Sequence, residues 1–304
     1  MASAASPLIY EVSVLRRHRA IKTHINVYFY ISNLEVDNLG FHFVYYNRQI
    51  KYYLIKSWNK MKKIIMLLIV TFGSHVAAEI RSVHCPLGCP SLDIQDNDVV
   101  FNHTYALSNN PTTKFADWVA YEVNVLNFGD SPGRDWGNDD LIDDDESLEE
   151  DDYKGAFKAL KTDRGHLAPL ASFAGHLNWS ELNYLSNITP QKSALNQGSW
   201  VALEMAVRDA VSFRNSLYVI TGTLYLEEET PLPGADEAHV IPSSYFKVIY
   251  DSKGNAASFV FDQDLPRNAS YCDQKTANKD LNLNIQYAMP KFTDSTEVLK
   301  RLGC

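Results

Sequence analysis

The chain has 304 residues, of which 45% are apolar, so it is long enough to bury a substantial core in one or two domains. It carries 28 basic and 37 acidic residues, a formal net charge of −9, which argues against a broadly basic surface for binding nucleic acid. The sequence contains neither a G-x-G-x-x-G stretch nor a P-loop, so a nucleotide-cofactor fold is not supported.

The N-terminal part does not resemble a folded domain. In residues 1–60, clustered arginines precede a Tyr/Phe/Ile-rich patch with no clear period. A basic start at Met61 then leads into a short apolar run that ends in small residues at Ala78, which is typical of a secretory signal and too short to span a bilayer. We therefore expect translation to start at Met61, residues 61–78 to be a cleaved signal peptide, and residues 79–304 to form one domain. The alternative is a genuine N-terminal arm with an internal anchor.

Cleavage near Ala78 would leave 18 of the 28 basic residues and 34 of the 37 acidic ones, a net charge of −16. Phosphate affinity usually comes from lysine and arginine, so this balance is awkward for a protein that approaches a polyanion. We therefore expect any phosphate-binding site to be local, formed by a few arginines and a metal cation in a cleft.

All four cysteines follow the expected cleavage position. Four cysteines allow three pairings. A zinc site would require paired C-x-x-C motifs with histidine, and the spacing does not fit that pattern. Disulfides are therefore expected, which indicates a compartment outside the reducing cytosol. The four residues are Cys85, Cys89, Cys272 and Cys304.

From residue 99 onward, short segments rich in β-branched and aromatic residues alternate with turn signals, and one segment is helix-forming. Strands followed by a helix and further strands predict an α+β fold with a mostly antiparallel sheet. The expected strands are 99–106, 115–123, 216–222, 245–250 and 257–262, with turns at 109–111 and 253–255 and a helix over 201–211.

An acidic segment covers residues 139–152, of which ten are Asp or Glu. A calcium loop would place a glycine at its bend and a bidentate glutamate at its end, and this segment has neither in the required position. The segment therefore favours a solvated acidic loop.

One stretch concentrates the residues with catalytic capability. Residues 163–170 read Asp-Arg-Gly-His-Leu-Ala-Pro-Leu, where the proline stops any helix from running through. Further on, Asn196, Glu204 and Arg208 are spaced by 8 and then 4 residues, within roughly 120° of one another on one helix side. We expect the Arg-Gly-His turn to face this side of the helix and to form an active site with it.

Four motifs in this order resemble the sugar-non-specific DNA/RNA endonuclease family. The resemblance covers about residues 85 to 272. A lone Asp-Arg-Gly-His motif would be weak evidence for this family, but four motifs in the family's order are strong evidence. The motifs are Asp-Arg-Gly-His at 163–166, Ser-Asn-Ile-Thr-Pro-Gln at 186–191, Leu-Asn-Gln-Gly-Ser-Trp at 195–200 and Leu-Glu at 203–204.

The resemblance implies an α+β fold of the ββα-metal (His-metal finger) type, with a central, mostly antiparallel sheet flanked by helices. It implies a secreted enzyme, extracellular or periplasmic, that hydrolyses DNA and RNA without sequence or sugar specificity and leaves 5′-phosphates. Mg²⁺ is the implied cofactor, with Mn²⁺ as a substitute. It also implies a homodimer and the disulfides Cys85–Cys89 and Cys272–Cys304. No stable membrane insertion is expected after cleavage of the signal peptide.

His166 is the expected general base, because the ordinary pKa of histidine lies near working pH. The alternative is a buried histidine that bonds a backbone carbonyl. The resemblance implies that the backbone carbonyl of Asn183 orients His166 and that Asn196 is the sole direct ligand of Mg²⁺. Asn196 as a helix N-cap is the alternative, and both roles could hold together. Glu204 would act on the metal through water, or instead pair with Arg208 on the helix surface.

Three arginines are expected to meet the substrate. Arg134 resembles the family's arginine that stabilises charge in the transition state, and Arg164 and Arg208 would clamp flanking phosphates. We also expect Asn183 to bind the substrate. Asn187 either hydrogen-bonds in the catalytic site or fixes the Ser-Asn-Ile-Thr-Pro-Gln turn.

Two alternatives to this function remain open. One is a catalytically inactive module that binds nucleic acid. The other is a nuclease of narrower range, such as a toxin effector or a DNA-uptake factor. Plasmid cleavage distinguishes the first alternative from an active enzyme.

Overall fold

The computed structural model describes four ranges of the chain, and the chain divides into two compact units. The described ranges are residues 52–57, 64–69, 80–90 and 96–304. The units are residues 1–76 and 77–304.

In the first unit, β1 (Tyr52–Ser57) and β2 (Ile64–Ile69) pair as antiparallel strands. The expected signal peptide overlaps β2, and the rest of residues 61–78 lies outside the described residues. The start at Met61 and the cleavage near Ala78 therefore stay predictions.

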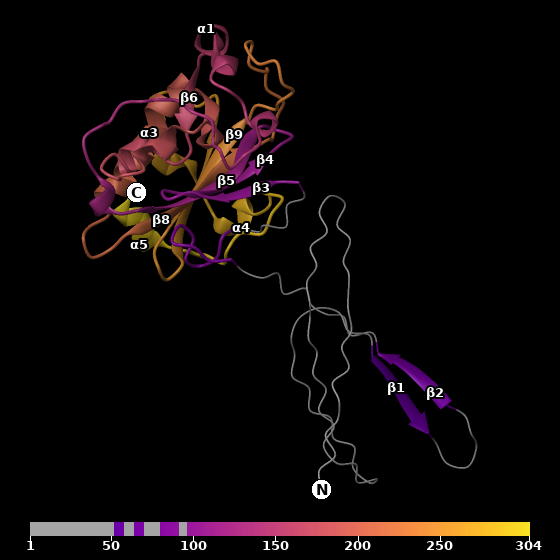
Figure 1. The fold of residues 1–304 in the computed structure, drawn as a ribbon. Coiled ribbons are helices and arrows are strands. Elements are labelled where there is room, and N and C mark those ends of the chain that lie inside the picture. Colours follow the sequence, from indigo (N-terminus) through magenta and orange to yellow (C-terminus); the bar gives the residue numbers. More distant parts are fainter. Residues whose placement is uncertain (1–51, 58–63, 70–79, 91–95) are drawn as a thin grey trace. The chain divides into compact units, whose positions relative to one another are not determined.

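An eight-stranded sheet forms the centre of the second unit (Figure 1). Its strands lie in the order β11-β10-β9-β8-β5-β4-β3, and β12 pairs with the start of β10. All pairings in this sheet are antiparallel except that of β10 with β12, so the expected mostly antiparallel sheet is confirmed. The strands are β3 (Asp98–Phe101), β4 (Ala106–Asn110), β5 (Phe115–Val123), β8 (Leu217–Leu224), β9 (Ser244–Tyr250), β10 (Asn255–Asp262), β11 (Lys275–Thr276) and β12 (Thr293–Asp294).

The two faces of this sheet bury separate cores, because side chains along a strand alternate between faces. On one face, α3 (Val201–Asp209) and α5 (Thr296–Arg301) contribute Leu203 and Val298 to the larger core. On the other face, α4 (Asn278–Leu281) contributes Leu281 to the second core. The expected flanking helices are thus present on both faces.

The strand predictions agree with the structure except at one position. The predicted strand 99–106 is two strands, because β3 ends at Phe101 and β4 begins at Ala106. Between them the backbone N–H of Asn102 donates to the carbonyl of Tyr105 at 2.9 Å, which closes a tight turn. The prediction overlooked the polar residues Asn102 and His103, which lie in this turn.

A separate two-stranded sheet carries the Asp-Arg-Gly-His motif. β6 (Thr162–His166) pairs antiparallel with β7 (Ile188–Lys192), so that His166 lies opposite Ile188. The expected Arg-Gly-His turn is therefore wrong, since this segment is a strand. A helical segment follows β7 in three parts, α2 (Ser193–Leu195), a π-type turn η7 (Asn196–Trp200) and α3. Figure 1 shows β6 close to α3.

Both disulfides implied by the resemblance are present. Cys85 is bonded to Cys89, and Cys272 is bonded to Cys304, which joins the C-terminus to the segment after β10. The zinc alternative for these cysteines is therefore excluded.

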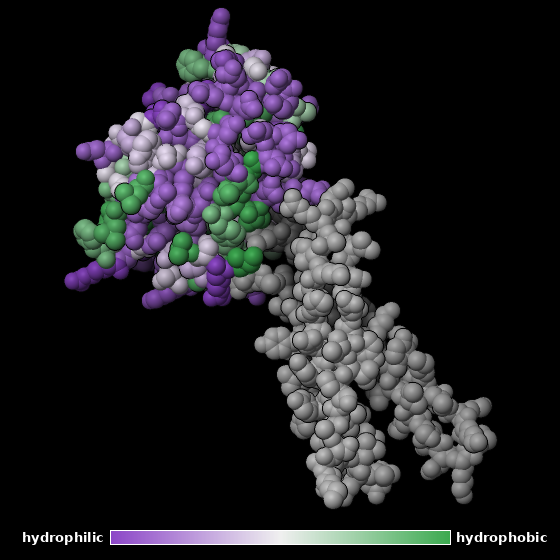
Figure 2. Space-filling view, in the orientation of Figure 1, coloured by the Kyte–Doolittle hydropathy of each residue, from purple (hydrophilic) through white to green (hydrophobic). Residues whose placement is uncertain are grey.

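The described surface is mainly polar. Figure 2 shows a largely hydrophilic face over residues 80–304, with small separate hydrophobic patches. Within the described ranges, no helix combines the length and the apolar character that crossing a bilayer requires.

Candidate nuclease site

Gly165 lets the β6–β7 hairpin close. A Cβ atom at this position would lie 2.3 Å from Oε1 of Gln191, whose fully buried side chain packs over the glycine. No other residue type leaves that space, so the glycine between Arg164 and His166 is needed for the strand pairing. The hairpin in turn fixes the positions of Asp163 and His166 on one short strand.

Asp163 joins this hairpin to the helical segment. Its Oδ2 accepts hydrogen bonds from Nδ2 of Asn196 at 2.9 Å and from Nε2 of Gln197 at 2.8 Å. Its Oδ1 accepts one from the hydroxyl of Ser193 at 2.5 Å. The sequence prediction missed this role, although Asp163 is the first residue of the Asp-Arg-Gly-His motif.

The contact with Asp163 orients the amide of Asn196. Because Nδ2 donates to the carboxylate, Oδ1 is the end of the amide that is left to accept or to bind a cation. Asn196 has helical dihedral angles, φ −55° and ψ −46°, so the N-cap alternative is wrong. It begins the π-type turn η7, and therefore the simple α-helical spacing from Asn196 to Glu204 does not hold.

Gly198 is where this π-type turn kinks. A Cβ atom there would lie 2.5 Å from the carbonyl oxygen of Arg267, so the close approach of the two backbones requires glycine. The kink separates the part of the helix that carries Asn196 from α3, which carries Glu204.

His166 is half-buried at the end of β6. Its Nε2 lies 3.1 Å from Oδ1 of the Asn183 side chain, and its ring packs against Trp136 with 5.5 Å between ring centres. The resemblance implied a contact with the backbone carbonyl of Asn183, but in this structure His166 contacts the side-chain Oδ1 of Asn183, and the carbonyl accepts from the N–H of Gly137. The side chain of Asn183 therefore positions His166, and it is fully buried and not a substrate contact.

Burial lowers the pKa of His166 to about 4. The hydrogen bond with Asn183 opposes this shift, and the positive charge of Arg134 adds to it. The value is lower than the ordinary histidine pKa on which the sequence interpretation relied. The imidazole is thus neutral at physiological pH, which is the form that a general base requires.

Asn187 is a positioning residue. Its Oδ1 accepts from the N–H of Ala168 at 2.8 Å, and its Nδ2 donates to the carbonyls of Ala168 and Leu182. The side chain is fully buried and its hydrogen bonds are all made within the protein. Of the two roles considered from the sequence, the structure favours the structural one, but the side chain fixes the chain at Ala168 and Leu182 and not within the 186–191 motif. The N–H of Leu167 also donates to the Asn187 carbonyl.

Glu204 lies inside the protein on α3. Its Oε1 is buried and forms an ion pair with Nζ of Lys247 at 3.5 Å. Burial raises the pKa of Glu204, while the charges of Lys247 and Arg208 oppose that shift. The expected alternative of a surface carboxylate paired with Arg208 is therefore wrong.

A cleft of about 580 Å³ lies next to the hairpin. Arg134, Arg164 and Asn196 line it, together with Asp163 and Trp136. His166 and Glu204 are not among the lining residues. His166 reaches the edge of the cleft through its contact with the Trp136 ring.

Arg164 is held between aromatic rings and an acidic residue. Its guanidinium carbon lies 5.2 Å from the centre of the Trp136 ring and 5.5 Å from that of Tyr153. Its Nη1 lies 3.1 Å from Oε1 of Glu150, and its Nη2 donates to the Glu150 carbonyl at 2.9 Å. The three neighbours of this arginine were not predicted.

The structure does not bring Arg208 to this cleft. Arg208 is half-buried at the end of α3 and does not line the cleft. Its Nη1 is buried and has no hydrogen-bond partner among the residues that the structure describes. The predicted clamp of flanking phosphates by Arg208 therefore has no support, unlike that by Arg164.

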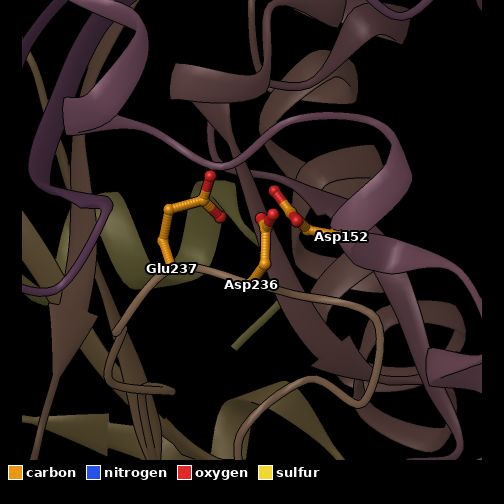
Figure 3. A group of neighbouring side chains, drawn as sticks. All are labelled: Asp152, Asp236 and Glu237. Carbon is orange, nitrogen blue, oxygen red and sulfur yellow. The ribbon is translucent and has the colours of Figure 1, made fainter.

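The acidic segment is not wholly solvated. Asp139 is 3% exposed and accepts hydrogen bonds from Asn102 and Ser186, and Asp152 is equally buried. Asp152 faces Asp236 and Glu237 from the β8–β9 connection (Figure 3), and ligand atoms of the three lie within 4.8 Å of one another. The prediction of a solvated loop is therefore wrong for Asp139 and Asp152.

Residues 87–288 match the family model described as DNA/RNA non-specific endonuclease. A protein named Nuclease from Serratia marcescens is 43% identical over 218 residues, which are 69% of this chain and 82% of that protein. Human mitochondrial Endonuclease G is 31% identical over 163 residues, 48% of this chain and 52% of that protein.

A solved structure of the EndoG/EndoGI complex contains a chain with a similar fold. The TM-score is 0.56 at 21% sequence identity, over 67% of this chain and 88% of that one. At this identity the likeness concerns the fold alone, and it agrees with the α+β arrangement around the antiparallel sheet.

Proposed function

The chain belongs to the DNA/RNA non-specific endonuclease family and is an endonuclease, and we propose that it is an exported, Mg²⁺-dependent enzyme of the ββα-metal type. It hydrolyses phosphodiester bonds of DNA and RNA without sequence or sugar preference. The strand order β6, β7 followed by a helix supports the ββα assignment.

His166 acts as the general base. Its neutral imidazole takes a proton from the attacking water as the water oxygen bonds to phosphorus. The bond from phosphorus to the 3′-oxygen breaks, so the products carry 5′-phosphates. Burial keeps the imidazole unprotonated at neutral pH, which is the form that accepts a proton, and the low pKa of about 4 also makes it a weaker base than an ordinary histidine.

Asn196 would hold the metal ion directly, and Glu204 would act on it through water. The residues fit an oxygen-liganded cation, because Asp163 leaves Oδ1 of Asn196 available and Glu204 supplies a buried carboxylate. Nucleases of this family generally depend on a metal ion. When bound, Mg²⁺, or Mn²⁺ in its place, neutralises charge on the phosphate and the leaving oxygen.

Arg134 and Arg164 bind the phosphates. Both line the cleft, and Arg134 is close enough to His166 for its charge to lower the pKa of the imidazole. Contacts to phosphate position a nucleic acid without reading its bases, which explains a lack of sequence preference. Two local arginines and a cation also compensate for the acidic balance of the chain.

One observation carries this proposal. A single strand, β6, supports both the general base and, through Asp163, the metal ligand Asn196. The hairpin therefore sets the two functional groups in one rigid arrangement, as general-base catalysis at a metal site requires.

Export is supported by the two disulfides, which persist in oxidising compartments. We propose that the signal is removed near Ala78 and that the secreted chain begins at Glu79. N-terminal sequencing of secreted protein tests this, and an intact Met1 start would contradict it. A homodimer stays a proposal, and sedimentation of the secreted protein measures it.

The decisive experiment is incubation with supercoiled plasmid and with RNA, with and without EDTA. We expect both substrates to be degraded with Mg²⁺ and neither with EDTA. Binding without cleavage would identify an inactive nucleic-acid-binding module. Cleavage of only one substrate would identify a nuclease of narrower range, such as a toxin effector or a DNA-uptake factor.

A further inference from the structure

Lys247 lies wholly inside the protein, directly behind the candidate site. It is the fourth residue of β9, and its side chain is 1% exposed. Its Nζ lies 3.3 Å from the carbonyl oxygen of Leu167 and 3.5 Å from Oε1 of Glu204. The same atom lies 3.8 Å from the centre of the Trp200 ring, a favourable cation–π contact.

These contacts reach both halves of the site. Leu167 immediately follows His166, and Nζ of Lys247 donates a hydrogen bond to its carbonyl. The indole N–H of Trp200 donates to the carbonyl of His166 at 3.3 Å. Glu204 belongs to α3, on the other side of the site. One atom, Nζ of Lys247, therefore contacts both the Leu167 carbonyl, which follows His166, and the Glu204 carboxylate.

Fold stability alone does not explain an ion pair at this depth. Removing two charges from water is costly, and well-packed apolar residues of similar volume commonly give equal or greater stability. Burial lowers the pKa of Lys247 to about 8 and raises that of Glu204, and each charge opposes the shift of its partner. An apolar residue on β9 could neither bond the Leu167 carbonyl nor compensate Glu204.

We propose that Lys247 is a positioning residue of the nuclease reaction, whose ammonium group holds the backbone after His166 and the carboxylate of Glu204 in one fixed arrangement. It acts through these two residues and touches neither the substrate nor the metal ion. The inference rests on the roles proposed above for His166 and Glu204.

The first test compares Lys247→Met with Val248→Ala. Methionine keeps the length of the side chain without its charge. Val248 is the next residue of β9 and points to the opposite core, so its truncation weakens packing without reaching the site. Melting temperature, kcat, KM for plasmid and the Mg²⁺ concentration for half-maximal rate are measured for each variant.

We expect kcat of Lys247→Met to fall by about tenfold to a hundredfold, with a raised Mg²⁺ requirement and a smaller change in KM. Val248→Ala is expected to lower the melting temperature and leave kcat and the Mg²⁺ requirement near wild type. A folded Lys247→Met protein with wild-type kcat and Mg²⁺ requirement would overturn the proposal and leave Lys247 as a core residue.

A second measurement needs no Lys247 variant and decides the question if Lys247→Met does not fold. The ¹⁵N resonance of the Lys247 ammonium group is expected to move when Mg²⁺ is added to wild type and not when it is added to Asn196→Ala. An unmoved resonance in protein that binds Mg²⁺ would contradict the inference. Wild-type protein without Mg²⁺-dependent cleavage would instead overturn the proposed function.

Discussion

Asp163 and Asn196 are joined by a hydrogen bond of 2.9 Å, from Nδ2 of the amide to Oδ2 of the carboxylate. Since Ser193 and Gln197 donate to the same carboxylate, Asp163 holds the beginning of the helical segment against β6. An outer residue of this kind fixes which end of the amide is presented to a cation. The orientation of the metal ligand therefore depends on a residue that need not touch the metal.

We predict that Asp163→Ala weakens Mg²⁺ use about tenfold to a hundredfold, because Asn196 loses the partner that orients it. The measurement is the rate of plasmid cleavage as a function of Mg²⁺ concentration. Asp140→Ala, which removes an exposed carboxylate of the acidic segment, is the matched control and should behave as wild type. An unchanged Mg²⁺ requirement in Asp163→Ala would show that Asn196 is oriented without it.

We predict that protonation of His166 produces an acidic limb of kcat/KM at about pH 4, because burial lowers its pKa to about that value. Above this pH the imidazole is neutral and able to accept a proton. His166→Ala should lose roughly 10²- to 10⁴-fold in rate and should lack this acidic limb. Rates measured from pH 3 to 8 on folded protein test both statements, and a folded variant that retains most of its turnover would refute the general-base assignment.

The positive charge of Arg134 lowers the pKa of His166. This charge disfavours the protonated imidazole, so Arg134→Ala should raise the pKa of His166 and move the acidic limb of the pH–rate profile upwards. The rate on the plateau should also fall, because the cleft loses a phosphate contact. Lys253→Ala, which removes an exposed charge from the turn between β9 and β10, should move neither. A limb that stays in place in Arg134→Ala would mean that the two residues are not electrically coupled.

The central sheet could be predicted from the sequence because its signals are local. β5 coincides with the predicted strand 115–123, since a segment rich in aromatic and β-branched residues identifies a strand without knowledge of its partners. The Asp-Arg-Gly-His segment was expected to be a turn, because its pairing with β7 is a contact between residues more than twenty positions apart. Spacing within one segment contains no signal for such a contact.

The site residues likewise divide into those that a local motif identifies and those that depend on contacts between distant segments. The motifs identified His166 and Asn196, which the structure brings to one hairpin and the helical segment after it. Lys247 was missed because it comes from β9, about eighty residues after Leu167, and a lysine in a strand resembles a surface residue. Arg208 was placed at the cleft from an uninterrupted helix, and the π-type turn at Gly198 changes that geometry.

Glu150 forms an ion pair with the guanidinium of Arg164. The carboxylate lies 3.1 Å from Nη1, where a substrate phosphate would bind, so phosphate and Glu150 compete for one cation. Removing this competitor in Glu150→Gln should lower KM for plasmid by about 1.5- to 5-fold, the range expected for an exposed ion pair. The effect should shrink as salt is added. Glu149→Gln removes the same charge from the neighbouring residue, whose side chain does not bond Arg164, and it should give a smaller change. Equal effects of the two variants would indicate general repulsion of the polyanion by the acidic segment and not competition at Arg164.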